Sequence, residues 1–435
     1  MEAIVVEGGK RLEGRVTVGG AKNSALPILV AALLAEGESV ICGVPVLHDV
    51  ETLIEILRNL GLDIERYSDG SLHTRVASED NCEAPYNQVK KMRASVCVLG
   101  PLVARRGHAR VALPGGCVIG TRPIDLHLKG LQALGAKIEV KHGYVEARAK
   151  ELVGREIYLG GAFGSSVLGT ANVMMAACLA KGRTVIECAA CEPEVQDLAH
   201  FLNKMGARIE GIGCHRLVIE GVDRLEGAEY RVIPDRIEAG TFLCAAAITR
   251  GDVVVDGVVF DHLMAVVDKL REAGVEVEKV EGKGTARPRH DGLEAVRASA
   301  FGGVKATDVT TLPYPGFPTD MQAQLMAVLS IGEGISVVTE KVYPDRFMHV
   351  AELGRMGADI RKEGCSAIIH GVPALSGAEV MASDLRASAA LILTGLVAIG
   401  KTKISRAYHI RRGYEKIEEK LRALGANTWT EPDAE

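Results

Sequence analysis

A repeat of about 70 residues constrains the fold of this chain more than any other feature. A glycine that ends one kind of helix and precedes an alternating strand recurs at Gly61, Gly135, Gly206, Gly274, Gly357 and Gly425. A second glycine series has a similar spacing and ends a different kind of helix, at Gly37, Gly107, Gly182, Gly251, Gly334 and Gly400. Two independent markers with one period predict six copies of a single αβ unit.

The two helices of each unit differ in where their apolar residues lie. Helices before the first glycine series are amphipathic, as over residues 50–60, 195–205 and 414–424. Those before the second series are apolar on almost every face, at residues 25–35, 94–104, 167–180, 239–249, 321–329 and 387–399. A helix that is apolar all round must be buried all round.

Six such helices cannot share one core in a chain of 435 residues. We therefore expect an α/β fold with two lobes of three units each, in which sheets and outer helices surround the buried helices. We place one lobe at residues 22–232, and the other at residues 1–21 together with 233–435. The active site is expected in the cleft between the lobes.

Composition narrows the class of protein. The chain is 47% hydrophobic and 25% charged, which is typical of a globular protein. A net charge of −5 and a pI near 6.2 argue against nucleic acid as a partner. The longest uncharged stretch, residues 159–180, is interrupted by Gly, Ser and Asn, so no membrane insertion is expected.

The ten cysteines are expected to be reduced thiols of a cytoplasmic protein, because the first residues do not resemble a signal peptide. Cys188 and Cys191 form the single C-x-x-C pattern. It has no second cysteine pair and no histidine at ligand spacing, so we expect no metal site there.

Basic residues stand in the first turns of four of the apolar helices: Lys22, Arg93, Arg236 and Arg386. A cation is unfavourable beside the positive end of a helix dipole. Free N–H groups together with Lys or Arg make an anion site. Because the same element is repeated, we expect all six helix starts to face a common cleft that binds an anionic ligand.

Residues 113–123 place the thiol of Cys117 among Gly115, Gly116 and Gly120, with Arg122 five residues after it. Glycines allow the backbone to come close to a ligand. An arginine favours the thiolate and can bind phosphate or carboxylate. The pattern fits a reactive thiol at an anion site, and it also fits a surface turn with an incidental cysteine.

Nine short motifs, in the same order along the whole chain, resemble those of the enolpyruvyl transferase family. They surround Lys22, Arg93, Cys117, Arg122, Arg236, Asp320, Arg346, Arg386 and Arg412. The resemblance implies a two-lobed inside-out α/β barrel fold. It also implies transfer of the enolpyruvyl group of phosphoenolpyruvate to the 3′-hydroxyl of UDP-N-acetylglucosamine, with release of phosphate by addition and elimination. No cofactor or metal is implied.

The resemblance also implies roles for individual residues. Cys117 would protonate C3 of phosphoenolpyruvate and form a covalent adduct with it, and Asp320 would accept the proton of the sugar hydroxyl. Lys22 and Arg412 complete the catalytic set. Phosphoenolpyruvate would be held by Lys22, Asn23, Arg122, Arg386 and Arg412. UDP-N-acetylglucosamine would be held by Arg93, Arg122, Pro123, Ile124, Asp125, Leu126, Ser165, Ser166, Asp320, Val342 and, more weakly, Arg236.

This reaction is the first committed step of peptidoglycan precursor synthesis. The resemblance therefore implies a role in cell wall biogenesis, cell shape, the cell cycle and cell division. It also implies that the epoxide fosfomycin would alkylate the Cys117 thiolate.

The sequence departs from the family at two places. Residues 160–166 form a longer, glycine-rich segment, and Arg411 stands where an acid is commoner, which predicts a more positive local field. Two alternatives remain open. Enolpyruvyl transfer to shikimate 3-phosphate is disfavoured because those enzymes lack the thiol of this loop. A non-catalytic nucleotide-sugar binding paralogue would be expected to have lost Cys117 or Asp320.

Overall fold

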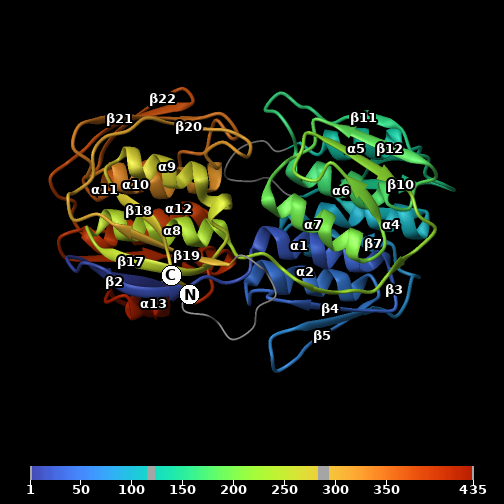
Figure 1. The fold of residues 1–435 in the computed structure, drawn as a ribbon, viewed down its shortest axis with the longest axis horizontal. Coiled ribbons are helices and arrows are strands. Elements are labelled where there is room, and N and C mark those ends of the chain that lie inside the picture. Colours follow the sequence, from blue (N-terminus) through green and yellow to red (C-terminus); the bar gives the residue numbers. More distant parts are fainter. Residues whose placement is uncertain (1, 115–122, 283–292, 434–435) are drawn as a thin grey trace. The chain divides into compact units, whose positions relative to one another are not determined.

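The computed structural model describes residues 2–114, 123–282 and 293–433 (Figure 1). The described chain forms two compact units. The N-terminal unit runs from Gly20 to Ile233, and the C-terminal unit combines the residues up to Gly19 with those from Pro234 onward. The sequence predicted these two boundaries between residues 21 and 22 and between residues 232 and 233.

Each four-stranded sheet of the N-terminal unit has the same topology. A short first strand pairs in parallel with the second, and the other two follow antiparallel. The first sheet is β16 (Glu229–Arg231), β4 (Glu38–Cys42), β6 (Leu72–Val76) and β5 (Leu62–Arg66). The second is β7 (Glu83–Ala84), β8 (His108–Ala112), β10 (Tyr144–Arg148) and β9 (Lys137–Lys141). The third is β11 (Glu156–Tyr158), β12 (Arg183–Glu187), β14 (Arg216–Glu220) and β13 (Arg208–Glu210).

The C-terminal unit repeats this topology. One sheet is β2 (Glu13–Thr17), β17 (Asp252–Val258), β19 (Glu294–Ser299) and β18 (Glu276–Val280). Another is β20 (Val309–Thr311), β21 (Ile335–Glu340), β23 (Ser366–His370) and β22 (Asp359–Glu363). The last is β24 (Glu379–Met381), β25 (Lys401–Ser405), β1 (Glu2–Glu7) and β26 (Asn427–Pro432). The first strand of the chain thus completes the sixth repeat, which confirms the repeat seen in the sequence.

One helix of each repeat is largely buried, although α4 is half-buried over its last three residues, 104–106. These are α1 (Lys22–Ala31), α4 (Leu99–Arg106), α6 (Val167–Ala177), α8 (Arg236–Ile248), α10 (Gln322–Leu329) and α12 (Leu385–Val397). Figure 1 shows α8, α10 and α12 between β17 and β19 on one side and β20–β22 on the other. Each unit has its own apolar core. Helices inside and sheets outside are as predicted, and no sheet closes into a barrel within the described residues.

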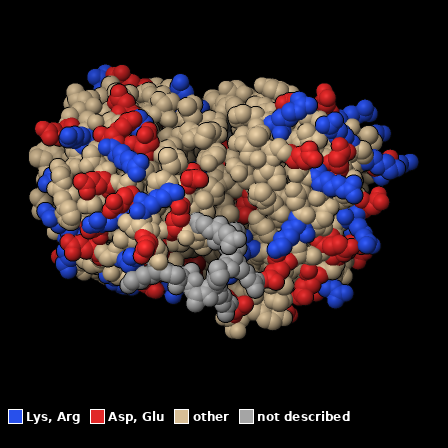
Figure 2. Space-filling view, in the orientation of Figure 1, with Lys and Arg blue, Asp and Glu red and all other residues tan. Residues whose placement is uncertain are grey.

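The second helix of each repeat buries only one face. These are α2 (His48–Asn59), α5 (Asp125–Ala133), α7 (Pro193–Lys204), α9 (Met264–Glu272), α11 (His349–Arg355) and α13 (Ile417–Ala423). On the face shown in Figure 2, basic and acidic side chains are interspersed over each unit.

Most helix boundaries differ from the prediction by one to four residues, and at two helices a separate 3₁₀ helix accounts for the difference. The helix expected at 94–104 begins as a 3₁₀ helix, Arg93–Val98, and becomes α-helical only at Leu99. Pro101 in the first turn of α4 has no N–H to donate, which suits a helix start there. The helix expected at 414–424 begins at Ile417, because residues Ala407–Arg412 form a separate 3₁₀ helix.

Candidate active site

Asp320 of the C-terminal unit lies between two buried arginines. It belongs to the 3₁₀ turn Thr319–Met321 that leads into α10. Arg346 Nη1 lies 2.8 Å from Asp320 Oδ1, and Arg386 Nε donates to Asp320 Oδ2 at 3.3 Å. The two arginines are only 5% and 1% exposed. The arrangement fixes the carboxylate and places two buried positive charges beside one partly exposed acid.

Arg386 has hydrogen-bond donors that the described residues do not satisfy. It lies in the first turn of α12, where Asp384 Oδ1 accepts from the Arg386 N–H at 2.7 Å and caps the helix. Its guanidinium lies 5.2 Å from the ring centre of Tyr414. Within the described residues Nη1 and Nη2 have no hydrogen-bond partner, although Nη2 lies 3.3 Å from Asp320 Oδ2. Buried donors of this kind are costly, so the geometry fits an anionic ligand.

A network of polar side chains supports Arg386. The Tyr414 hydroxyl lies 2.9 Å from Thr241 Oγ1 on α8 and accepts from Gln324 Nε2 at 3.1 Å. Gln324 Nε2 also donates to the Asp320 carbonyl at 2.9 Å. Thr241 and Gln324 each stand singly on a helix that reads as apolar core from the sequence, and Tyr414 lies just before α13, so their shared role could not be predicted.

Glu340, at the end of β21, organises the segment that follows it. Its Oε1 accepts from the Thr311 hydroxyl at 2.6 Å and from the Val342 N–H at 2.8 Å, and its Oε2 accepts from the Thr319 hydroxyl at 2.9 Å. One buried carboxylate thus links Val342, a predicted sugar contact, to the turn that carries Asp320. No feature of the sequence indicated a role for Glu340, and Arg346 was predicted only as part of a motif.

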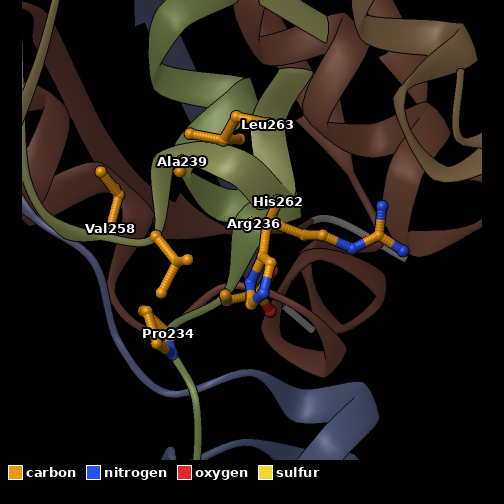
Figure 3. A pocket seen from close by; sticks show the side chains of 8 residues that line it. Pro234, Arg236, Ala239, Val258, His262 and Leu263 are labelled. Atoms are coloured by element: carbon orange, nitrogen blue, oxygen red, sulfur yellow. The ribbon is translucent and has the colours of Figure 1, made fainter. Parts of the chain in front are cut away.

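Arg236 is a further predicted ligand contact of the C-terminal unit. It begins α8, and its guanidinium lies 5.6 Å from the Tyr314 ring. It lines a small pocket with Pro234, Ala239, Val258 and Leu263, which Figure 3 shows. Asp320 and Arg386 do not line that pocket.

Arg412 ends the 3₁₀ helix that immediately precedes Gly413 and Tyr414, and it is half-buried. Its neighbour Arg411 forms ion pairs with Glu418 at 2.8 Å and with Glu2 at 3.4 Å. These two acids offset the additional positive charge that the sequence predicted at Arg411.

In the N-terminal unit, Lys22 is the first residue of α1 and is 6% exposed. Its Nζ lies 3.3 Å from Oδ2 of Asp49, a buried acid in the first turn of α2. The sequence predicted that Lys22 binds an anionic ligand, and it did not indicate that Asp49 is a partner within the protein. Asn23 follows it and is half-buried.

Asp197 on α7 holds the first turn of α1 in place. It accepts from the Ser24 hydroxyl, from the Tyr230 hydroxyl at 2.5 Å and from the Ile233 N–H at 3.2 Å. The position of Lys22 and Asn23 is therefore set by a residue about 175 places later, through a buried charge-assisted network.

The other predicted contacts of the N-terminal unit gather around α5 and α6. Burial and the charge of Arg93 lower the pKa of His127 to about 4, so Arg93 lies near the start of α5. Ser166 caps α6 by accepting from the Gly169 N–H at 3.1 Å, and Ser165 precedes it. Leu126 packs close to Gly161 and Gly169. Of the remaining predicted contacts, Pro123 and Asp125 are exposed, and Ile124 is half-buried.

Cys117 and Arg122 lie outside the described residues, so their predicted roles remain predictions. Within the described ranges, no three His, Cys, Asp or Glu side chains are grouped so that they could hold a metal ion. None of the helices in this part of the chain is long and apolar enough to cross a bilayer.

Comparison with known proteins places the chain in a family. The model of the family described as EPSP synthase (3-phosphoshikimate 1-carboxyvinyltransferase) matches residues 6–421. A protein of Myxococcus xanthus named UDP-N-acetylglucosamine 1-carboxyvinyltransferase is 55% identical over 429 residues, covering 98% of this chain and 99% of that protein. One of the same name from Methylacidiphilum infernorum is 53% identical over 98% of both chains.

Solved structures agree on the fold. The enolpyruvyl transferase NikO from Streptomyces tendae superposes with a TM-score of 0.86 at 24% identity, covering 99% of this chain and 98% of that one. EPSP synthase from Acinetobacter baumannii superposes with a TM-score of 0.74 at 19% identity, covering 99% and 100%. The chain therefore belongs to the family of 1-carboxyvinyl (enolpyruvyl) transferases and is a transferase enzyme.

Proposed function

We propose that this enzyme transfers the enolpyruvyl group of phosphoenolpyruvate to the 3′-hydroxyl of UDP-N-acetylglucosamine and releases phosphate. The observation that carries the proposal is the buried guanidinium of Arg386, whose two Nη atoms have no hydrogen-bond partner among the described residues. Phosphoenolpyruvate has a carboxylate of matching shape, which can accept two parallel hydrogen bonds from such a group. The choice of acceptor rests on the names of the relatives that are 52–55% identical.

The reaction assigns work to residues of both units. Arg386 would orient phosphoenolpyruvate through its carboxylate, with Asn23 assisting. Lys22, Arg122 and Arg412 would face the phosphate, whose charge grows as it leaves. Arg93, residues 123–126, Ser165, Ser166 and Val342 would hold the nucleotide sugar, with Arg236 as a weaker contact.

The chemistry proceeds by addition and then elimination. Cys117 would give a proton to C3 while the sugar oxygen bonds to C2, and Asp320 would accept the proton of that hydroxyl. The resulting ketal loses phosphate and one proton from C3, which restores the double bond. Arg346 and Arg386 hold the Asp320 carboxylate in one orientation, which is the geometry a general base requires.

The product would be the first committed precursor of peptidoglycan. The proposal therefore extends to cell wall biogenesis, cell shape, the cell cycle and cell division, in the cytoplasm where reduced cysteines are expected. The Cys117 thiolate would make the enzyme a target of fosfomycin, because an epoxide phosphonate combines an electrophile with an anion that the same cations would attract.

A phosphate-release assay with purified protein tests the proposal. Phosphoenolpyruvate with UDP-N-acetylglucosamine should release phosphate, whereas phosphoenolpyruvate with shikimate 3-phosphate should not. Arg386→Met should abolish release, while Arg361→Met should not affect it, because Arg361 is exposed and pairs with Glu363 on its own strand. Turnover of shikimate 3-phosphate would contradict the proposed acceptor, and full activity of Arg386→Met would contradict the assigned carboxylate site.

A further inference from the structure

Three buried polar side chains meet between the inner helices of the C-terminal unit. Helices α8, α10 and α12 pack against one another there (Figure 1). Thr241 lies on α8, Gln324 lies on α10, and Tyr414 follows the 3₁₀ helix Ala407–Arg412. Thr241 and Tyr414 are each 1% exposed, and Gln324 is wholly buried. Polar groups at this depth need partners, so each of their hydrogen bonds can be assigned a donor and an acceptor.

The available donors and acceptors fix the direction of each hydrogen bond. Gln324 Nε2 donates to the Asp320 carbonyl at 2.9 Å and to the Tyr414 hydroxyl at 3.1 Å. The Thr241 hydroxyl donates to the Ile237 carbonyl at 2.8 Å, so the Tyr414 hydroxyl, which is 2.9 Å away, donates to Thr241 Oγ1. In the opposite direction the Tyr414 proton would face Gln324 Nε2, which only donates.

The orientation of the Gln324 amide is determined as well. Its Oε1 has no hydrogen-bond partner among the described residues. Turning the amide over would place this oxygen against the Asp320 carbonyl, so that two acceptors would repel each other where a hydrogen bond now lies. The chain of hydrogen bonds therefore runs in one direction, from Gln324 through Tyr414 to Thr241.

This chain ends beside the Arg386 guanidinium. The guanidinium carbon lies over the Tyr414 ring, 5.2 Å from its centre. A Cβ added at Gly413 would lie 3.6 Å from Arg386 Nη1, so the backbone before Tyr414 passes directly beside the same group. Arg386 Nε in turn donates to Asp320 Oδ2 at 3.3 Å. The guanidinium thus contacts both a carboxylate and an aromatic ring.

Tyr414 contacts Arg386 without a charge of its own. Burial raises the pKa of Tyr414, so the side chain is a neutral phenol at physiological pH. Its proton is donated to Thr241, and Arg386 meets the electron-rich face of the ring. Such a ring attracts a cation and leaves its charge in place, whereas a second carboxylate would compensate the charge that an anionic ligand needs.

We propose that Tyr414 is a positioning residue for the Arg386 guanidinium, and that Thr241 and Gln324 hold the Tyr414 ring in the place that this requires. This role rests on the proposed function, in which Arg386 binds the carboxylate of phosphoenolpyruvate. Tyr414 sets the direction of the two Nη groups and leaves their charge to the substrate. Gln324 extends the same order to the turn that carries Asp320, because its amide also donates to the Asp320 carbonyl.

Steady-state kinetics of phosphate release, with each substrate varied in turn, test this role. Tyr414→Phe keeps the ring but loses the hydroxyl that anchors it, so KM for phosphoenolpyruvate should rise about three- to tenfold, the range of one hydrogen bond. KM for UDP-N-acetylglucosamine and kcat should stay within about twofold, because an interaction that is equal in the ground state and the transition state changes KM alone. Tyr408→Phe is the matched control, since Tyr408 is an exposed tyrosine of the preceding 3₁₀ helix.

Two further sites separate positioning from packing. Thr241→Val keeps the shape of the side chain but cannot accept the Tyr414 proton, so it should raise the same KM. Thr241→Ser retains the hydroxyl and should keep the wild-type value. Gln324→Met should raise this KM and also lower kcat, because it releases the turn that carries Asp320.

Binding measured without turnover separates this role from the proposed function. Phosphoenolpyruvate alone should raise the Tm of the wild type and of Tyr408→Phe more than that of Tyr414→Phe. A wild type that releases no phosphate with UDP-N-acetylglucosamine but keeps this difference in Tm would contradict the proposed acceptor and support the positioning role. A wild-type KM for phosphoenolpyruvate in Tyr414→Phe, or an equal change in both KM values and kcat, would overturn the role. Equal effects of Thr241→Val and Thr241→Ser would overturn it too.

Discussion

Replacing Asp320 by Asn removes a negative charge that pairs with both Arg346 and Arg386. Both guanidinium groups would remain buried, at 5% and 1% exposure, with an amide in place of their carboxylate. Asn keeps the size of the side chain and one acceptor oxygen. The substitution therefore isolates the loss of charge from any change of packing.

The structure sets the size of the effect. Removing one partner of a buried ion pair costs about 3–5 kcal/mol. The Asp320 side chain is 27% exposed, which partly screens its ion pairs at 2.8 and 3.3 Å, so we take the lower end, about 3 kcal/mol. The C-terminal unit has roughly 220 residues, for which about 3 kcal/mol corresponds to a fall in Tm of about 6–12 °C.

Calorimetry or thermal circular dichroism of the ligand-free enzyme measures this change. Inorganic phosphate should raise the Tm of Asp320→Asn more than that of the wild type, because the two arginines then lack the carboxylate with which both form ion pairs. Asp359→Asn is the matched control, since Asp359 is an exposed acid of the same unit. If Asp320→Asn melts within about 1 °C of the wild type, the two arginines do not depend on this carboxylate and the description of the site is wrong.

Three further predictions concern other parts of the chain. Cys117→Asp should keep measurable phosphate release and resist fosfomycin, because a carboxylic acid can donate a proton but is a poor nucleophile, whereas Cys117→Ser should lose most turnover. A Cys117→Asp variant that is folded and binds the nucleotide sugar but is inactive would refute the proton-donor role. The pKa of His127 is lowered to about 4 in the folded state, so the unfolded state binds a proton first as the pH falls, and the free energy of unfolding should drop by about 2 kcal/mol between pH 7 and pH 5. Denaturant titrations of His127→Gln should show a free energy of unfolding that depends less on pH by that amount, and an unchanged pH dependence would exclude a neutral buried imidazole. Glu340→Gln should destabilise the enzyme by about 2 kcal/mol and raise KM for UDP-N-acetylglucosamine more than it lowers kcat, whereas Glu333→Gln, at an exposed position, should do neither. An unchanged KM in Glu340→Gln would show that Glu340 does not set the position of Val342.

The fold could be predicted from sequence because its signals are local and repeated. Two glycine series and two kinds of helix each recur with one period, so an error at one copy is corrected by the others. The boundaries at 94–104 and 414–424 were wrong because 3₁₀ geometry and backbone register are decided by neighbouring elements. The sixth sheet, in which β1 joins β25 and β26, depends on contacts between the two ends of the chain.

The site was predicted only in part, for a related reason. Cations at helix starts can be read from sequence because a cation opposes the helix dipole. Their partners within the protein cannot, since Asp49 reaches Lys22, and Asp197 reaches the nearby Ser24, from other helices.

The most direct test of the proposed function is the identity of its product. Purified enzyme should be incubated with UDP-N-acetylglucosamine and phosphoenolpyruvate labelled with ¹³C at C3, and the nucleotide sugar then analysed by mass spectrometry and NMR. The proposal predicts a nucleotide sugar heavier by one carboxyvinyl group, with a labelled vinyl carbon attached through the 3′-oxygen and one phosphate released for each product. Phosphate released while the nucleotide sugar remains unlabelled, or label attached to a different acceptor, would contradict it.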